Sequence, residues 1–108
     1  MSNSVGPVLR MSDDLDAIVA AIVEDNPGKQ ISVIDRGAYT RVSGDGELRV
    51  TRASIERNLG RNFEMRQLEG LMSAFAGRID MTSEEVWWRL KSAGPSSPAA
   101  EASVEEPA

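Results

Sequence analysis

Residues 30–50 read QISVIDRGAYTRVSGDGELRV, and this run carries the clearest β-strand pattern of the chain. Short stretches of alternating apolar and polar residues are separated by glycine-containing turns, as expected for strands with one buried face. Glycine favours such turns because it accepts a positive φ. The run therefore predicts three strands in an antiparallel meander, over Gln30–Asp35, Ala38–Ser43 and Glu47–Val50.

Three helices are predicted around these strands. Apolar residues between Leu15 and Val23 recur at i, i+3, i+4, i+7 and i+8, which is the stripe of an amphipathic helix. A second, short helix precedes Gly60, and a third runs from Phe63 to about Ala76. The predicted caps and stops of the three helices are Ser12 with Pro27-Gly28, Thr51 with Gly60, and Asn62 with Gly77.

Three more strands complete the expected order. Val5–Met11 precedes the first helix, and Pro7 places it at a sheet edge, because proline lacks the N–H of a central strand. Arg78–Met81 and Glu85–Leu90 follow the third helix, and alternation favours Trp88 as the buried residue of the Trp pair. We therefore predict an α+β fold, an antiparallel sheet packed with three helices in the order β-α-β-β-β-α-α-β-β.

The expected domain organisation is a single domain over residues 1–93 followed by a disordered acidic tail over residues 94–108. The tail, GPSSPAAEASVEEPA, holds three prolines, three glutamates and one aliphatic side chain, Val104. Such a composition cannot offset the entropy of ordering. We interpret it as a solubilising extension.

Composition excludes several classes of function. The chain has neither cysteine nor histidine, and its net charge is −5. It therefore lacks the commonest general base, thiol chemistry and the usual transition-metal ligands, so no catalytic residues, no metal and no cofactor are expected. An all-carboxylate site, which would suit magnesium or calcium, is the alternative that composition leaves open. The negative charge argues against nucleic acid as a partner, and no apolar run is long enough to cross a bilayer. Without an apolar leader in the first ten residues, we expect a soluble, cytoplasmic protein.

Three features leave alternatives open. Arginine outnumbers lysine ten to two, which suits protein interfaces but also follows from coding bias. Gly70 interrupts a predicted helix, and the small-residue run around it either packs on the sheet or offers another protein a close-contact surface. Glu24-Asp25 falls where a helix ends, which indicates a nearby basic partner or an ordinary turn.

Motifs spread in order over Asn3–Leu90 resemble the small effector (coupling) proteins of soluble diiron monooxygenases, the MmoB/DmpM-like family. The resemblance is nearest to the toluene and alkene monooxygenase branch. The residues that carry it are Asn3 with Val5-Gly6-Pro7, Asn26-Pro27-Gly28-Lys29, Ile31, Val33, Asp35-Arg36, Ala38-Tyr39, Gly46-Glu47-Leu48, Leu59-Gly60-Arg61 with Phe63, and Phe75-Ala76-Gly77 with Ile79.

The resemblance implies a non-enzymatic regulatory subunit without a cofactor, a monomer when free. Its partner would be a diiron hydroxylase, bound over the active site so that turnover, oxygen activation and regioselectivity change. Family contact segments match two parts of this chain, and with the Gly70 observation they predict the partner-binding residues Asn3, Ser4, Val5, Gly6, Pro7, Gly70, Ser73, Ala74, Phe75 and Gly77.

Departures from the family pattern leave the substrate open between aromatic compounds and alkenes. Ala74 stands where the toluene-type effector has serine, and Ser73 where it has alanine. The long N-terminal arm of the methane monooxygenase effector is absent, and the C-terminal tail is extra. Two other classes of function remain: an unrelated α+β protein-interaction adaptor module, and a small metal-independent isomerase or hydrolase, which would lack a poised base.

Overall fold

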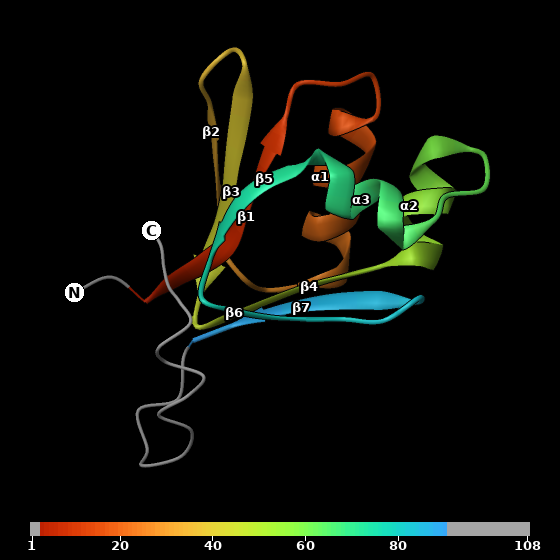
Figure 1. The fold of residues 1–108 in the computed structure, drawn as a ribbon. Coiled ribbons are helices and arrows are strands. Elements are labelled where there is room, and N and C mark those ends of the chain that lie inside the picture. Colours follow the sequence, from red (N-terminus) through yellow and green to blue (C-terminus); the bar gives the residue numbers. More distant parts are fainter. Residues whose placement is uncertain (1–2, 91–108) are drawn as a thin grey trace.

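The computed structural model describes residues 3–90, and along these residues three helices alternate with β-strands (Figure 1). The α+β class and the three helices are confirmed, and one further strand, β5, is added to the predicted order. The elements in chain order are β1 (Ser4–Arg10), α1 (Leu15–Asp25), β2 (Ile31–Asp35), β3 (Tyr39–Asp45), β4 (Glu47–Thr51), α2 (Arg52–Leu59), α3 (Met65–Leu71), β5 (Met72–Ala76), β6 (Arg78–Met81) and β7 (Glu85–Arg89).

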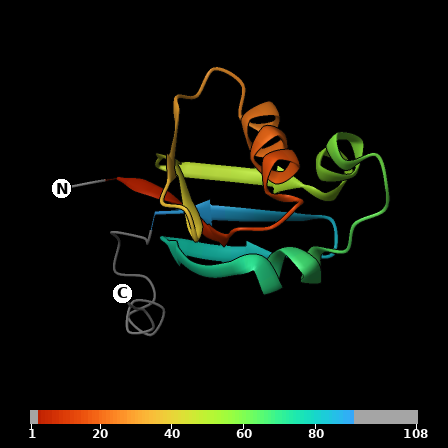
Figure 2. The same cartoon turned by 90° about the horizontal axis from the view of Figure 1, so that it is seen from above.

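The strands form two antiparallel sheets instead of the single one expected. One sheet has the order β2-β3-β1-β5, and the other the order β4-β7-β6, whose strands lie side by side in Figure 2. The predicted meander is wrong at its second turn, because β3 and β4 enter different sheets. Gly46, with φ of +80°, joins them, and its N–H donates to the carbonyl of Asn3 at 2.8 Å. The glycine thus redirects the chain between sheets.

Strand β1 lies in the middle of the four-stranded sheet, so the predicted edge position of Pro7 is wrong. In the β1–β3 ladder Val5 lies opposite Gly44 and Val8 opposite Arg41, and no residues between them are paired. The ladder is interrupted where Pro7 has no N–H to donate, and this is how a central strand tolerates proline.

Helix α3 is shorter than predicted, because Met72–Ala76 pairs with β1 as strand β5. Pairing with β1 satisfies the backbone groups of this segment that face β1 and places Met72 opposite the buried Leu9. The N-cap is Glu64, whose N–H donates to Gln67 Oε1 at 2.9 Å, and not Asn62. Helix α1 likewise begins after Asp14, two residues beyond the predicted cap. Helix α2 is confirmed, with Thr51 as N-cap and Gly60 as its left-handed C-cap.

The core lies between the two sheets and the helices. Trp88 is fully buried, as its alternation with Val86 predicts. Trp87 points to the other face of the sheet, where the guanidinium carbons of Arg49 and Arg89 lie 5.1 Å and 4.3 Å from the centroid of its ring. The largest other fully buried side chains are Leu9, Ile18, Ile22, Leu48, Ile55, Phe63 and Leu68. Burial of these apolar surfaces is the main stabilising contribution to the fold.

The end of α1 is fastened to β4 and α2 by its acidic residues. Asp25 accepts hydrogen bonds from the Thr51 N–H at 2.8 Å and the Ser54 hydroxyl at 2.6 Å. Glu24 pairs with Arg57 at 2.7 Å. The basic partner that Glu24-Asp25 indicated is therefore within the chain, on α2.

The predicted tail, residues 94–108, lies outside the described residues, so its disorder stays a prediction. Among residues 3–90, none of the helices is long and apolar enough to cross a membrane.

Candidate functional site

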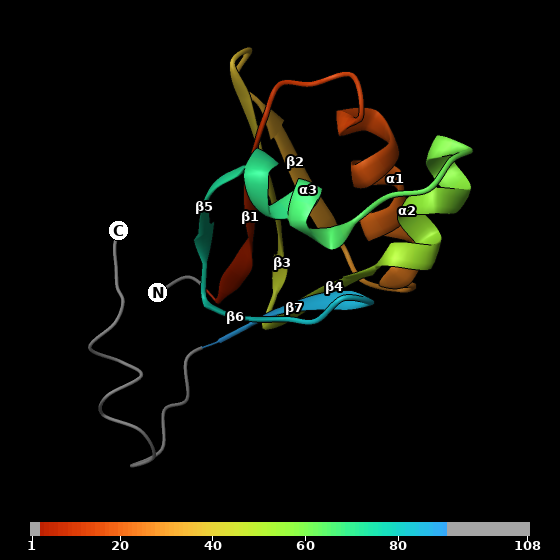
Figure 3. The same cartoon turned by 45° about the vertical axis from the view of Figure 1, so that its right-hand side comes forward.

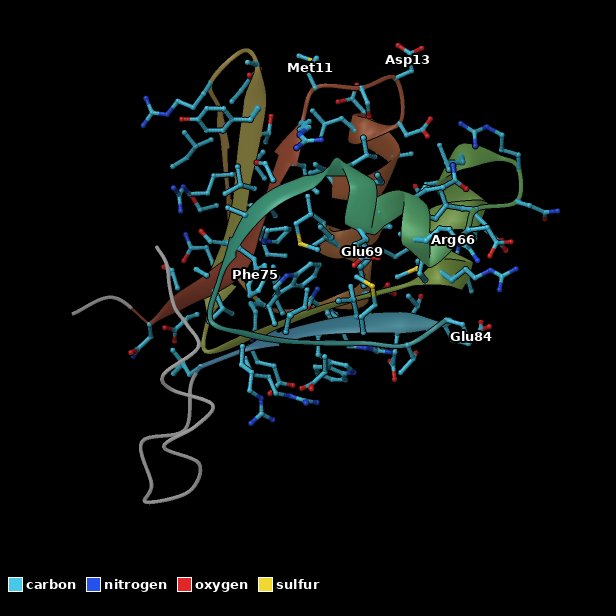
Figure 4. The ribbon with its side chains drawn as sticks, viewed as in Figure 1. Met11, Asp13, Arg66, Glu69, Phe75 and Glu84 are labelled. Carbon is cyan, nitrogen blue, oxygen red and sulfur yellow. The ribbon has the colours of Figure 1, made fainter. Side chains whose placement is uncertain are left out.

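Four of the predicted partner-binding residues come together at the surface where α3 passes into β5. Gly70, Ser73, Ala74 and Phe75 are all exposed, and we call this group the β5 surface. Strand β5 ends the order β2-β3-β1-β5, so its outer edge faces no neighbouring strand of this sheet. Figure 3 shows this strand along one side of the molecule. In Figure 4 Phe75 and Glu84 lie at opposite ends of the molecule. An uncovered strand edge offers backbone groups to another chain.

Gly70 is open to solvent. A Cβ added there would meet no atom within 4 Å, apart from the helix's own backbone, so Gly70 itself does not pack on the sheet. The following part of the small-residue run does join the sheet, because Met72–Ala76 pairs with β1. The Gly70 carbonyl accepts a hydrogen bond from Arg10 Nη1 at 3.1 Å, which links the end of α3 to the end of β1. The glycine therefore leaves a flat, uncovered place on the last turn of the helix.

Ser73 occupies a β-bulge. Val8 lies opposite Ala74 and Leu9 opposite Met72, so Ser73 has no counterpart on β1. Its hydroxyl lies 3.4 Å from the Val8 carbonyl, to which it donates. A bulge bends an edge strand and re-aims its side chains. Here it separates the apolar contact of Met72 from the exposed Ala74 and Phe75.

The N-terminal candidates divide into two groups. Asn3 and Ser4 are exposed, whereas Val5, Gly6 and Pro7 are buried within the chain and present no side-chain surface to a partner. Their burial follows from the central position of β1, which the sequence did not reveal. At Gly6 a Cβ would lie 2.1 Å from the carbonyl of Val42, so glycine is required there for close packing.

Gly77 also has a structural role. Its φ is +95°, and a Cβ there would lie 2.5 Å from the Arg89 carbonyl and 2.8 Å from a Val5 methyl. It turns the chain from the first sheet into the second. Because Gly6 pairs with Ala76, the exposed Asn3 and Ser4 lie near the other end of the β1–β5 pair from Gly70, roughly 20 Å along the strand.

The clearest electrostatic perturbations occur away from the β5 surface. The pKa of Glu56 is lowered because its carboxylate accepts from the Phe63 N–H at 2.9 Å and from Arg52 Nε at 3.1 Å. The pKa of Glu24 is lowered by hydrogen bonds from Arg57 and Asn58. Both carboxylates hold α2 to its neighbours. Within residues 3–90, acidic side chains form no group of three that could hold a metal ion.

Fold and surface together define a small α+β domain whose candidate site is a strand edge lined by small and aromatic side chains, a surface suited to contact with another protein chain. The chain belongs to the MmoB/DmpM family, whose model matches residues 3–89. The predicted family resemblance is thereby confirmed.

Similar proteins agree with this assignment. The chain is 48% identical over 90 residues to the effector subunit of the alkene monooxygenase system of Xanthobacter autotrophicus (strain ATCC BAA-1158 / Py2), covering 83% of this chain and 89% of that one. A chain in the structure of the phenol hydroxylase–regulatory protein complex has the same fold, with a TM-score of 0.69, 23% identity, and coverage of 82% of this chain and 99% of that chain. The soluble methane monooxygenase regulatory protein B also shares it, with a TM-score of 0.66, 22% identity, and coverage of 91% and 72%.

Proposed function

We propose that the chain is the effector subunit of a multicomponent monooxygenase and acts by binding its hydroxylase component. The observation that carries this proposal is the 48% identity, over most of both chains, to an effector subunit of an alkene monooxygenase system. This similarity also favours an alkene over an aromatic compound as the substrate of the hydroxylase. The solved structures support the fold on which the role depends.

In this role the chain has no catalytic residues of its own. Its carboxylates with lowered pKa values, Glu24 and Glu56, are engaged by neighbouring hydrogen-bond donors and stay ionised at neutral pH, so they make poor general bases. The effector would change turnover, oxygen activation and regioselectivity by altering the conformation of its partner. That the free chain is a cytoplasmic monomer stays a prediction of the sequence.

The β5 surface supplies the proposed contact. Gly70 and Ala74 have little or no side chain, which permits close approach of a partner's backbone or helix. Phe75, 45% exposed, follows Ala74 on β5 and points to the other face of the strand, so it supplies an apolar anchor on the other side of the same edge. The uncovered edge of β5 adds backbone hydrogen-bonding groups. Asn3 and Ser4 extend the proposed contact at the far end of the same strand pair.

The test is a titration of the purified chain into the hydroxylase with its electron-transfer components. We expect product formation to rise and saturate, and direct binding to be measurable by calorimetry. Ala74→Trp is expected to weaken binding at least tenfold, because bulk at a close contact prevents approach. The matched control is Ala53→Trp, at an exposed alanine on α2, which should bind like the unsubstituted chain.

Two results would contradict the proposal. Absence of binding to the hydroxylase would favour the adaptor alternative and overturn the effector role. If the Ala74→Trp and Ala53→Trp variants bind the hydroxylase with equal affinity, the effector role stands, but the β5 surface is not part of the contact.

A further inference from the structure

The arginines of the described chain are divided between two kinds of environment. Within residues 3–90, six arginines take part in ion pairs with carboxylates, namely Arg49, Arg52, Arg57, Arg61, Arg78 and Arg89. Four others, Arg10, Arg36, Arg41 and Arg66, form no ion pair with any described residue. Three of these four belong to one part of the fold, strand β1, strand β3 and the turn before β3.

The strand register places two of these arginines on one face. Arg41 lies opposite Val8 on one side and Ile34 on the other, and Arg10 lies opposite Tyr39. Residues directly opposite one another in antiparallel strands share a face. The intervening Thr40 and Val42 are buried on the other face, beneath the helices. Arg10, Ile34, Tyr39 and Arg41 therefore share the solvent side of the sheet, which we call the outer face.

The outer face has no helix over it in the described structure. In Figures 1 and 3 the three helices lie on the same side of the four-stranded sheet, next to the core. Ile34 is 39% exposed and Tyr39 41% exposed, so apolar surface accompanies the two guanidinium groups. Asp45 stands on the same face at the other end of β3, about 13 Å from Arg41. The basic end of the face is thus separated from its acidic end.

This combination matches one kind of partner. Arginine and tyrosine are enriched at protein interfaces, and a planar guanidinium binds a carboxylate through two parallel hydrogen bonds. The chain as a whole has a net charge of −5, so the basic end of the outer face is a local positive patch on an acidic protein. The outer face is also continuous with Ala74 of the β5 surface, because Val8 lies between Arg41 and Ala74 in one row across the sheet.

We propose that the basic end of the outer face, Arg10, Tyr39 and Arg41, binds an acidic surface of the hydroxylase component beside the contact made by β5. This inference rests on the proposed effector function and extends its interface across β1 and β3. Arg41 is the clean probe, because its side chain forms no hydrogen bond or ion pair with the described residues, whereas Arg10 also holds the Gly70 carbonyl.

The experiment compares Arg41→Gln with Arg57→Gln, which removes the same charge from α2 at the far side of the helices. Affinity for the hydroxylase is measured by calorimetry at low and high salt, with melting curves to show that both variants are folded. We expect Arg41→Gln to weaken binding about fivefold to tenfold at low salt, and Arg57→Gln to change it less than twofold. The difference should shrink at about 1 M salt, where the Debye length is about 3 Å.

The outcomes distinguish failure of this inference from failure of the proposed effector function. If the unsubstituted chain does not bind the hydroxylase, the effector role fails. If it binds and Arg41→Gln matches Arg57→Gln, the role stands and the outer face is excluded. The same comparison is repeated with a chain that ends at residue 93, because the glutamates of residues 94–108 are an alternative partner for the arginines of the outer face. Persistence of the Arg41 effect in the shortened chain supports the hydroxylase as partner, and its loss overturns the proposal in favour of the tail.

Discussion

Replacing Gly70 by alanine is expected to stabilise the free chain. Gly70 lies in the last turn of α3 with helical backbone, and an added Cβ would meet nothing within 4 Å. The substitution therefore removes the conformational freedom of glycine in the unfolded chain without creating a clash. Glycine is less favourable than alanine in a helix by about 0.8–1.0 kcal/mol, and proximity to the helix end reduces the gain to about 0.5–1 kcal/mol.

This gain is measurable by thermal unfolding. For a domain of this size, 1 kcal/mol corresponds to about 4–8 °C, so the melting temperature of Gly70→Ala should rise by about 2–8 °C. Gly60→Ala is the matched control. Gly60 is equally open, but its φ is +79°, where an L side chain is strained, so the same substitution should lower the melting temperature.

Binding provides the second half of the test. Gly70→Leu should also fold at least as stably as the unsubstituted chain, since leucine is a good helix former and the space is empty. If Gly70 belongs to the hydroxylase contact, the same variant should bind more weakly, by about 1–3 kcal/mol. Destabilisation of the free Gly70→Ala variant would refute the reasoning about α3. Normal affinity of Gly70→Leu would refute the position of Gly70 in the contact.

Three further outcomes are expected. Asp25→Ala should lower the free energy of unfolding, measured in urea, by about 1–3 kcal/mol, because Thr51 and the buried Ser54 lose their acceptor. Glu56→Gln should flatten the dependence of melting temperature on pH. The folded-state pKa of Glu56 lies below its ordinary value of 4.5, so its contribution is present above about pH 4.5 and is lost as pH falls through the lower folded pKa. Deletion of residues 94–108 should change neither the melting temperature nor stimulation of the hydroxylase, since their composition offers almost nothing to bury.

Each of these has a contrary result. A loss for Glu24→Ala as large as that for Asp25→Ala would show that the exposed ion pair, and not the buried hydroxyl network, fastens α1. If the melting temperatures of the unsubstituted chain and of Glu56→Gln change in parallel with pH, Glu56 does not contribute to acid denaturation. A lower melting temperature after deletion of residues 94–108 would show that the tail contacts the folded domain.

The local signals of the sequence predicted what depends on neighbours along the chain. Helix α1, the Thr51 cap and Gly60 stop of α2, and the inward position of Trp88 are confirmed. The predicted apolar stripe of α1 is wrong at its last residue, because Val23 is 50% exposed. Periodicity and capping involve residues a few positions apart, so they need no knowledge of the rest of the fold. The family resemblance was carried by short motifs in order, and the family match bears it out.

The tertiary structure decided the position and exposure of the candidate contact residues. Met72–Ala76 fits a helix by spacing, but pairing with β1, more than sixty residues earlier, makes it a strand, and its bulge at Ser73 obscures the alternation that would have indicated one. The same pairing places β1 at the centre, which buries Val5, Gly6 and Pro7 and leaves Ala74 on an edge.

The arginines show the same division. Their number was visible in the sequence, but not which of them would lack a carboxylate partner. Arg49 meets Glu85 because β4 and β7 pair, whereas Arg41 faces Val8 and Ile34. Composition determines which chemical groups a chain carries, while contacts between distant segments determine which of those groups remain available to another molecule.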